Sequence, residues 1–292
     1  MEAAGRAAFP GFRLRVLERT PSTQDVVRAA ARAGAEGGFC CVAIAQSAGR
    51  GRQGRVWEAE PGAGLLMSVL LRVPGGVVGG VPLAAGVSVV DAVRGLGVPG
   101  GVVGVKWPND VLVGGRGKLA GILAEVEPAA RHRDGGPHAD GLPAPQNSSA
   151  ADSGNPAPKQ LVGGRAGSLS GRVAVALGIG LNLAIEAFPA GVEGASLHTL
   201  LGRSVPWHEA LAAVLRALGE RLRELESGGI PATAAAWRDH AVGLGQKVTA
   251  HTPTGTIRGT ALDIADDGAL LIDTPQGITR LLAGDVHLER PD

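Results

Sequence analysis

The chain has 292 residues, a 45% hydrophobic composition and a formal net charge of +1. This length allows one large domain or two, and the composition is sufficient for a sizeable buried core. The near-neutral charge argues against bulk binding to nucleic acid or to an anionic membrane surface.

The cysteines and the N-terminal residues bear on the compartment. Cys40 and Cys41 are adjacent in an apolar run. Neighbouring side chains on a strand point to opposite faces, so a structural disulfide is not expected and a reducing environment fits. Residues 1–10 lack the apolar centre of a signal peptide. The longest uncharged run, 73–90, holds five glycines and two prolines, which argues against a membrane span. A cytoplasmic protein is predicted.

The first predicted elements are a strand at 12–17 and a helix at 26–35. The strand alternates apolar and basic residues. Ser22 is a good N-cap for the helix, and Asp25 follows three residues later. A helix N-terminus also attracts anions, so a cap and a ligand contact are compatible here.

The stretch 45–57 is the most distinctive part of the chain. It interleaves three arginines with three glycines and ends in a tryptophan: Gly49, Arg50, Gly51, Arg52, Gly54, Arg55 and Trp57. The glycine spacing matches the dinucleotide fingerprint, but that motif needs a helix to open at the loop, and residues 56–60 run directly into Pro61-Gly62. We interpret the stretch as a cationic loop that closes over an anionic, partly flat ligand such as a nucleotide.

The middle of the chain alternates strands and a helix. The predicted elements are a strand at 65–72, a helix at 83–96, a strand at 102–106 and a hairpin of 111–113 with 119–126. Residues 128–171 then hold six prolines and no aromatic residue, which predicts a disordered insertion. His132 and His138 lie in it without cysteines or spaced carboxylates nearby, so a solvated loop is favoured over a metal site.

The last part of the chain changes from helical to strand patterning. A strand at 173–185 is followed by a helix at 207–226 and a second helix from Pro231 to about residue 242. Short strands with turn residues between them follow, at 246–251, 256–263, 269–273, 278–282 and 286–289. They predict a small β-barrel docked on the main domain. The predicted domains are 1–242 and 243–292, with 128–171 as an insertion.

Lysine is rare in this chain, since only four of its 28 Lys and Arg residues are Lys. Two of the four, Lys106 and Lys118, flank the turn Trp107-Pro108-Asn109-Asp110. A lysine at a hairpin tip is usually solvated, but this clustering favours a ligand-facing role, for Lys118 more than for Lys106. With the Gly/Arg loop, it suits a reaction in which a carboxylate is held close to an α-phosphate, as in acyl-adenylate formation.

Five segments, in this order, resemble the biotin–protein ligase family. They are Ser22-Thr23-Gln24, Gln46 with 49–57, 106–110, 118–123 and 178–182. The resemblance implies an α+β fold: a class II aminoacyl-synthetase-like mixed sheet with flanking helices, plus a small C-terminal SH3-like β-barrel. It also implies an ATP-dependent, AMP-forming ligase that uses Mg²⁺ to make biotinyl-5′-AMP.

The resemblance further implies the partners of the chain. The biotinyl group would pass to a lysine of the biotin carboxyl carrier domain of a biotin-dependent carboxylase. No helix-turn-helix precedes Phe12, so the resemblance is to the monofunctional ligases and no DNA partner is expected. No membrane partner is expected either, and the choice between monomer and homodimer stays open.

The resemblance assigns roles residue by residue. Lys118 and Arg50 would be catalytic. The biotin-binding set would be Ser22, Thr23, Gln24, Gln46, Arg50, Gly51, Arg52, Lys118 and Gly121. The ATP and adenylate set would be Arg50, Arg52, Arg55, Trp57, Asn109, Lys118 and Asn182, and the metal ligands stay open, with Asp110 as the candidate. Gln24 departs from the asparagine usual in the family by one methylene.

Two other functions remain alternatives. One is a lipoate or octanoate ligase or transferase, which shares the fold and the acyl chemistry. The other is a non-catalytic biotin-sensing module, against which the intact Lys118 and Arg50 argue.

Overall fold

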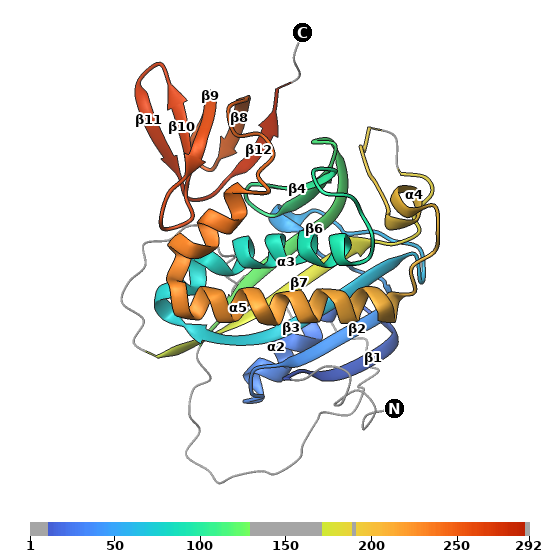
Figure 1. Cartoon of the computed structure of the whole chain (residues 1–292). Coiled ribbons are helices and arrows are strands. Elements are labelled where there is room, and N and C mark those ends of the chain that lie inside the picture. Colours follow the sequence, from blue (N-terminus) through green and yellow to red (C-terminus); the bar gives the residue numbers. More distant parts are fainter. Residues whose placement is uncertain (1–10, 129–170, 189–190, 290–292) are drawn as a thin grey trace.

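The computed structural model describes residues 11–128, 171–188 and 191–289, and its main feature is a seven-stranded mixed sheet (Figure 1). The strand order is β1-β2-β3-β7-β6-β5-β4, in which β1 and β2 are parallel and all other neighbours antiparallel. The strands are β1 (Arg13–Thr20), β2 (Phe39–Gln46), β3 (Gly64–Pro74), β4 (Val103–Lys106), β5 (Asp110–Val113), β6 (Gly117–Glu127) and β7 (Arg172–Asn182).

Helices cover both faces of this sheet. The helix α2 (Thr23–Arg32) packs on one face, and α3 (Val81–Gly95) and α5 (Trp207–Arg238) cross the other (Figure 1). Because side chains alternate along a strand, Cys41 belongs to the small core under α2 while Cys40 belongs to the large core under α3 and α5. Both cysteines are free and buried, as their adjacency predicts.

The predicted helices are present with shifted ends. Ser22 is the N-cap of α2, and its side chain accepts a hydrogen bond from the backbone N–H of Gln24, which confirms the predicted cap. The two helices predicted around Pro231 form the single element α5, interrupted at Gly229 where φ is 70°. It ends at Arg238, before the expected residue 242. A short helix, α4 (Leu197–Leu201), was not predicted.

One helical segment is both long and strongly apolar. Among the described residues, Gly75–Gly95 is the one segment long and apolar enough, by length and composition, to cross a membrane. Its most apolar window is 72% buried inside the structure, as in the core helix of a soluble protein, which passes the same test.

A second, five-stranded antiparallel sheet follows α5. Its order is β11-β10-β9-β8-β12, formed by β8 (Lys247–Thr252), β9 (Gly255–Ile264), β10 (Leu270–Thr274), β11 (Gly277–Leu281) and β12 (Asp285–Leu288). All five strands lie where the turn spacing predicts them. In the described residues β11 and β12 are open edges, so the pairing is that of a sheet and no barrel is closed.

Polar contacts join the C-terminal sheet and its turns to the turn after β4 and to the end of α5. The Trp107 indole N–H donates to the backbone carbonyl of Gly268 at 3.0 Å, and Arg238 Nε donates to Asp263 Oδ1 at 2.6 Å. The C-terminal sheet is thus held against the end of the main sheet that carries β4 and β5.

The predicted insertion lies almost wholly outside the described residues, which resume at Gly171. Its flanking strands are hydrogen-bonded neighbours, with Glu127 of β6 opposite Ala174 of β7. We expect replacement of 129–170 by a short Gly-Ser linker to leave the melting temperature and the enzymatic activity nearly unchanged. The physical reason is that loop shortening changes closure entropy by only about 0.6 kcal/mol per halving. Thermal unfolding and product formation by the two proteins check this; a large loss of either would assign the segment a structural or functional role.

Candidate functional site

A cavity lies on the α2 face of the main sheet, beside the N-terminal end of α2. It is enclosed by the start of α2, by the loop after β2, and by residues of β3, β5, β6 and β7. Of the predicted site residues, only Asn182 is absent from its lining, which includes Ser22, Thr23, Gln24, Gln46, Arg50, Gly51, Arg52, Arg55, Trp57, Asn109, Asp110, Lys118 and Gly121. The lining also includes Gly178 and Gly180, so residues from all five of the segments that resemble the family meet in one place.

The floor of the cavity is made by residues without large side chains. Gly178 and Gly180 lie two positions apart on β7 and therefore on the same face. Gly180 is paired with Gly121 of β6, and Gly178 with Ser68 of β3. A Cβ atom on Gly180 would lie 2.4 Å from the Trp57 ring, and one on Gly121 would lie 2.8 Å from it. The Trp57 ring therefore packs directly on the backbone of two neighbouring strands.

An irregularity in β6 places Lys118 on this floor. Val111 of β5 pairs with Ala120 of β6, but the next residue of β5, Leu112, pairs with Lys118. The pairing therefore skips Leu119. In a regular strand, residues three apart such as Lys118 and Gly121 would lie on opposite faces. The extra residue, Leu119, points into the large core instead, and Lys118 lines the cavity together with Gly121.

Lys118 lies in a short chain of charges. Its Nζ is 2.7 Å from Asp110 Oδ1 and 5.5 Å from the centre of the Trp57 ring. The other Asp110 oxygen is 3.4 Å from Lys106 Nζ. Burial raises the pKa of the Asp110 carboxyl, but the two lysines outweigh burial and hold that pKa below its usual value. Asp110 is thus a carboxylate at neutral pH and keeps Lys118 at the cavity wall.

The far end of the cavity is rich in hydrogen-bonding groups. Gln46 Oε1 accepts hydrogen bonds from the Thr23 backbone N–H (2.7 Å) and hydroxyl (3.1 Å). The Thr23 hydroxyl also lies 2.8 Å from the Ser68 hydroxyl. The Thr23 N–H at the start of α2 is therefore hydrogen-bonded to a side chain from β2. The hydroxyl and amide groups of Thr23, Gln46 and Ser68 could also hydrogen-bond to a small polar ring.

The Gly/Arg loop is a tight turn held by backbone hydrogen bonds. Gly51 N–H donates to the Arg55 carbonyl at 2.7 Å, and Trp57 N–H donates to the Gly49 carbonyl at 3.0 Å. The turn contains only a single 3₁₀ segment, η1 (Arg52–Gly54), and no α-helix opens there. This confirms the rejection of the dinucleotide fingerprint, which requires such a helix.

Two arginines of the loop contact different parts of the protein. Arg52 Nη1 donates to Asn109 Oδ1 at 3.0 Å, and Asn109 Nδ2 donates to the Ile122 carbonyl at 3.0 Å. Arg55 forms an ion pair with Asp285 of β12, which also lines the cavity. The C-terminal sheet therefore contributes a carboxylate to the site, a contact that no local pattern around Asp285 predicts.

Asn182 lies behind the cavity wall. Both hydrogen bonds of its Nδ2 go to backbone carbonyls, those of Lys118 (3.0 Å) and Ala195 (3.1 Å). It therefore ties the end of β7 to the backbone that carries Lys118. A direct contact with adenine remains a prediction.

Comparison with known proteins identifies the chain. The model of the Biotin/lipoate A/B protein ligase family matches residues 16–134, and that of the Biotin protein ligase C terminal domain matches 243–288. The Biotin--[acetyl-CoA-carboxylase] ligase of Mycobacterium tuberculosis is 34% identical over 290 residues, covering 96% of this chain and 91% of that protein. The chain belongs to the biotin protein ligase family. The Bifunctional ligase/repressor BirA of Bacillus subtilis is 29% identical over 91% of this chain and 71% of its own length.

Solved structures share the fold of this ligase family. The biotin protein ligase from Aquifex aeolicus in complex with biotin and ATP has a TM-score of 0.68 and 24% identity, covering 95% of this chain and 99% of that chain. This likeness confirms the predicted mixed sheet with flanking helices and a C-terminal β domain.

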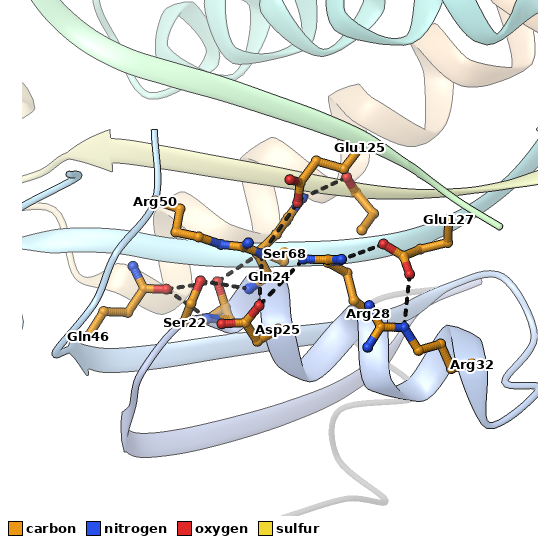
Figure 2. A network of polar contacts seen from close by, with 12 residues as sticks. Ser22, Gln24, Asp25, Arg28, Arg32, Gln46, Arg50, Ser68, Glu125 and Glu127 are labelled. Atoms are coloured by element: carbon orange, nitrogen blue, oxygen red, sulfur yellow. Dashed lines mark hydrogen bonds and ion pairs between the residues drawn. The ribbon is translucent and has the colours of Figure 1, made fainter. Parts of the chain in front are cut away.

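The structure accommodates the departure from the family pattern at Gln24. This side chain is buried, and its Nε2 donates to Glu125 Oε2 at 3.0 Å and to the Ala176 carbonyl at 2.9 Å (Figure 2). The Gln24 side chain therefore reaches from α2 to β6 and β7 on the face of the sheet that α2 covers.

The glycine floor of this biotin protein ligase yields a prediction. Gly180→Ala should raise the KM for ATP about tenfold, because the new Cβ displaces the Trp57 ring, which belongs to the predicted ATP set. Crowding of this kind costs about 1–3 kcal/mol. Steady-state kinetics measure the change. Gly95→Ala is the matched control, since its Cβ would have no neighbour within 4 Å. Equal KM values in the two variants would mean that the position of Trp57 is unimportant.

Proposed function

We propose that this chain activates biotin with ATP and transfers the biotinyl group to a lysine of a biotin carboxyl carrier domain. A carboxylate oxygen of biotin forms a bond to the α-phosphorus, and pyrophosphate leaves. The neutral amine of the carrier lysine then attacks the acyl carbonyl and loses a proton, and AMP leaves. The observation that carries the proposal is the convergence of the five family segments in one cavity around Lys118, in a chain whose relatives along its length are biotin ligases.

In this proposal Lys118 and Arg50 promote adenylate formation. Two anions must approach each other, and a cation between them stabilises the crowded transition state more than the ground state. The proposal is supported by the position of Lys118 at the cavity wall, 2.7 Å from Asp110, and by the rigid strand that carries it. Asp110 pairs with the Lys118 ammonium, and a substrate carboxylate or phosphate would compete with Asp110 for it.

The two ends of the cavity suit the two ends of biotinyl-adenylate. The hydroxyls and amides around Thr23, Gln46 and Ser68 suit a polar ring such as the ureido ring of biotin. Arg52, Arg55 and Asn109 suit the nucleotide, with Trp57 available to stack on adenine. Asn182 stays a proposed adenine contact, although it lies outside the cavity lining.

The residues present also fit Mg²⁺ bound together with the phosphates. Mg²⁺ at nucleotide sites is held by one or two carboxylates plus phosphate oxygens and water. Asp110 and Asp285 are carboxylates that line the cavity, and Asp110 adjoins Lys118. Across residues 11–128, 171–188 and 191–289 no group of three or more His, Cys, Asp and Glu is arranged as a protein-only metal site. When bound, the metal would neutralise phosphate charge, and Asp110 would be its candidate ligand.

The finer organisation belongs to the same proposal. The catalytic domain is 1–242, with a class II aminoacyl-synthetase-like sheet, and the SH3-like domain is 243–292. The acceptor is a carrier domain of a biotin-dependent carboxylase, in the cytoplasm. Both a monomer and a homodimer are compatible with this proposal.

A single labelling assay tests this function. The purified chain is mixed with a biotin carboxyl carrier domain, biotin, ATP and Mg²⁺, and the carrier is analysed by mass spectrometry for one added biotinyl group. Lipoate replaces biotin in a parallel reaction, and a carrier with its acceptor lysine changed to arginine is the control. Labelling with lipoate in preference to biotin, or no labelling, would overturn the proposal.

A further inference from the structure

Glu125 is a buried carboxylate beside the cavity that belongs to none of the predicted site sets. It lies on β6, is 2% exposed, and projects from the α2 face of the sheet. Its Oε2 accepts a hydrogen bond from Gln24 Nε2 (3.0 Å) and lies 3.3 Å from Arg50 Nη2 (Figure 2). One carboxylate oxygen thus joins the start of α2 to the Gly/Arg loop.

The contact with Glu125 determines the direction of the Gln24 amide. Its Nε2 donates to two acceptors, Glu125 Oε2 and the Ala176 carbonyl, and the opposite orientation would place oxygen against oxygen. The carbonyl oxygen, Oε1, is therefore directed toward Gly178, whose Cβ, if present, would lie 2.9 Å away. Within the described residues this buried oxygen has no hydrogen-bond partner.

A buried acceptor without a partner is costly unless a ligand supplies a donor. Gln24 and Gly178 both line the cavity, so this buried oxygen lies just behind the cavity wall, and a donor on a bound molecule would reach it after a small movement of the amide. The bicyclic ring of biotin carries two ureido N–H groups and is a donor of the required kind.

Glu125 acts at the same time on the loop. Arg50 Nη2 lies between two carboxylates, 2.8 Å from Asp25 Oδ1 and 3.3 Å from Glu125 Oε2. Asp25 is half exposed, whereas Glu125 is buried and therefore less screened by water. The buried partner attaches the loop to the sheet.

We propose that Glu125 is a positioning residue that presents the Gln24 carbonyl oxygen to a ureido N–H of biotin and fastens Arg50 over the bound ring. This inference rests on the proposed biotin ligase function. It links recognition of the ring to the position of the loop, because one carboxylate oxygen serves both.

The strand offers a matched control two residues further on. Glu127 is also 2% exposed and lies on the same face of β6, but it pairs with Arg28 (2.5 Å) and Arg32 (3.3 Å), which do not line the cavity. Replacing either glutamate by glutamine leaves an arginine with one carboxylate fewer, the partly exposed Arg50 in the first case and the buried Arg28 in the second. Both variants should therefore lose thermal stability. A positioning role for Glu125 predicts that only the Glu125 variant also changes the KM for biotin.

The experiment compares Glu125→Gln with Glu127→Gln, with biotin as the varied substrate and the carrier domain as acceptor. Glu125→Gln should raise the KM for biotin about tenfold, as expected for the loss of one charge-assisted contact, with a smaller change in kcat. It should also release adenylate, seen as more pyrophosphate than biotinylated carrier. Glu127→Gln should keep both quantities within about twofold of the wild type. Glu125→Asp keeps the charge but has a shorter side chain, so it should show the same KM change. This variant replaces Glu125→Gln in the test if Glu125→Gln does not fold.

A double-mutant cycle adds a test that a general structural role would not pass. Gln24→Met removes the acceptor, so Glu125→Gln should raise the KM for biotin less in that background than in the wild type. Full additivity, or the same KM in the Glu125 and Glu127 variants, would overturn the inference. Failure of the wild type to label the carrier would instead overturn the proposed function, so the two failures are distinguishable.

Discussion

Lys118→Ala is expected to lower the rate of biotinyl-adenylate formation by about 10²–10³-fold, which is typical for removal of one electrostatic group that stabilises a transition state. The side chain contacts Asp110 and faces the cavity, so in the proposed mechanism its loss removes the cation between the two substrate anions. Lys118→Arg should restore only part of the rate, since a planar guanidinium does not replace a compact ammonium.

Pyrophosphate release in the absence of carrier measures this step directly. Transfer from ready-made biotinyl-adenylate should be affected less than its formation. Lys106→Ala is the matched control, because Lys106 pairs with the same Asp110 at 3.4 Å but does not line the cavity. A near wild-type rate in Lys118→Ala, or an equal loss in Lys106→Ala, would assign the role elsewhere.

Arg50→Gly is expected to release the activated intermediate instead of abolishing its formation. Arg50 ties the loop to Asp25 and Glu125, and loss of charged hydrogen bonds of this kind costs about 1.5–3 kcal/mol. The rate of adenylate dissociation should rise about 10–100-fold. Freed biotinyl-adenylate then acylates exposed lysines of other proteins.

Biotinylation of a bystander protein without a carrier domain reports this release. The control is Glu58→Gly, which adds a glycine to the same exposed loop without removing a contact to the cavity lining. Bystander labelling by Glu58→Gly as strong as that by Arg50→Gly would attribute the effect to loop flexibility alone. Absence of labelling in both, with carrier labelling intact, would show that Arg50 does not retain the intermediate.

Local sequence patterns were sufficient for most of the secondary structure, and the family resemblance selected most of the residues that meet in the cavity. Ser22 was predicted as the cap of α2 because a cap depends on a few consecutive residues. The five C-terminal strands were predicted from alternation and turn residues, which are also local. The interleaved Gly and Arg residues at 49–55, with Lys118, indicated the chemistry because these side chains serve few other purposes in that combination.

Other features depend on which strands become neighbours, and only the tertiary structure decided them. The shift at Leu119 that turns Lys118 toward Gly121 is a property of the β5–β6 register. Asp285 reaches the loop because the C-terminal sheet docks against the main sheet, 230 residues along the chain from Arg55. Glu125 meets Gln24 and Arg50 across 101 and 75 residues. The sequence by itself determined most of the secondary structure and predicted which residues carry the chemistry; the tertiary structure decided how these residues are held, because buried charge pairing and strand register are set by contacts between distant segments.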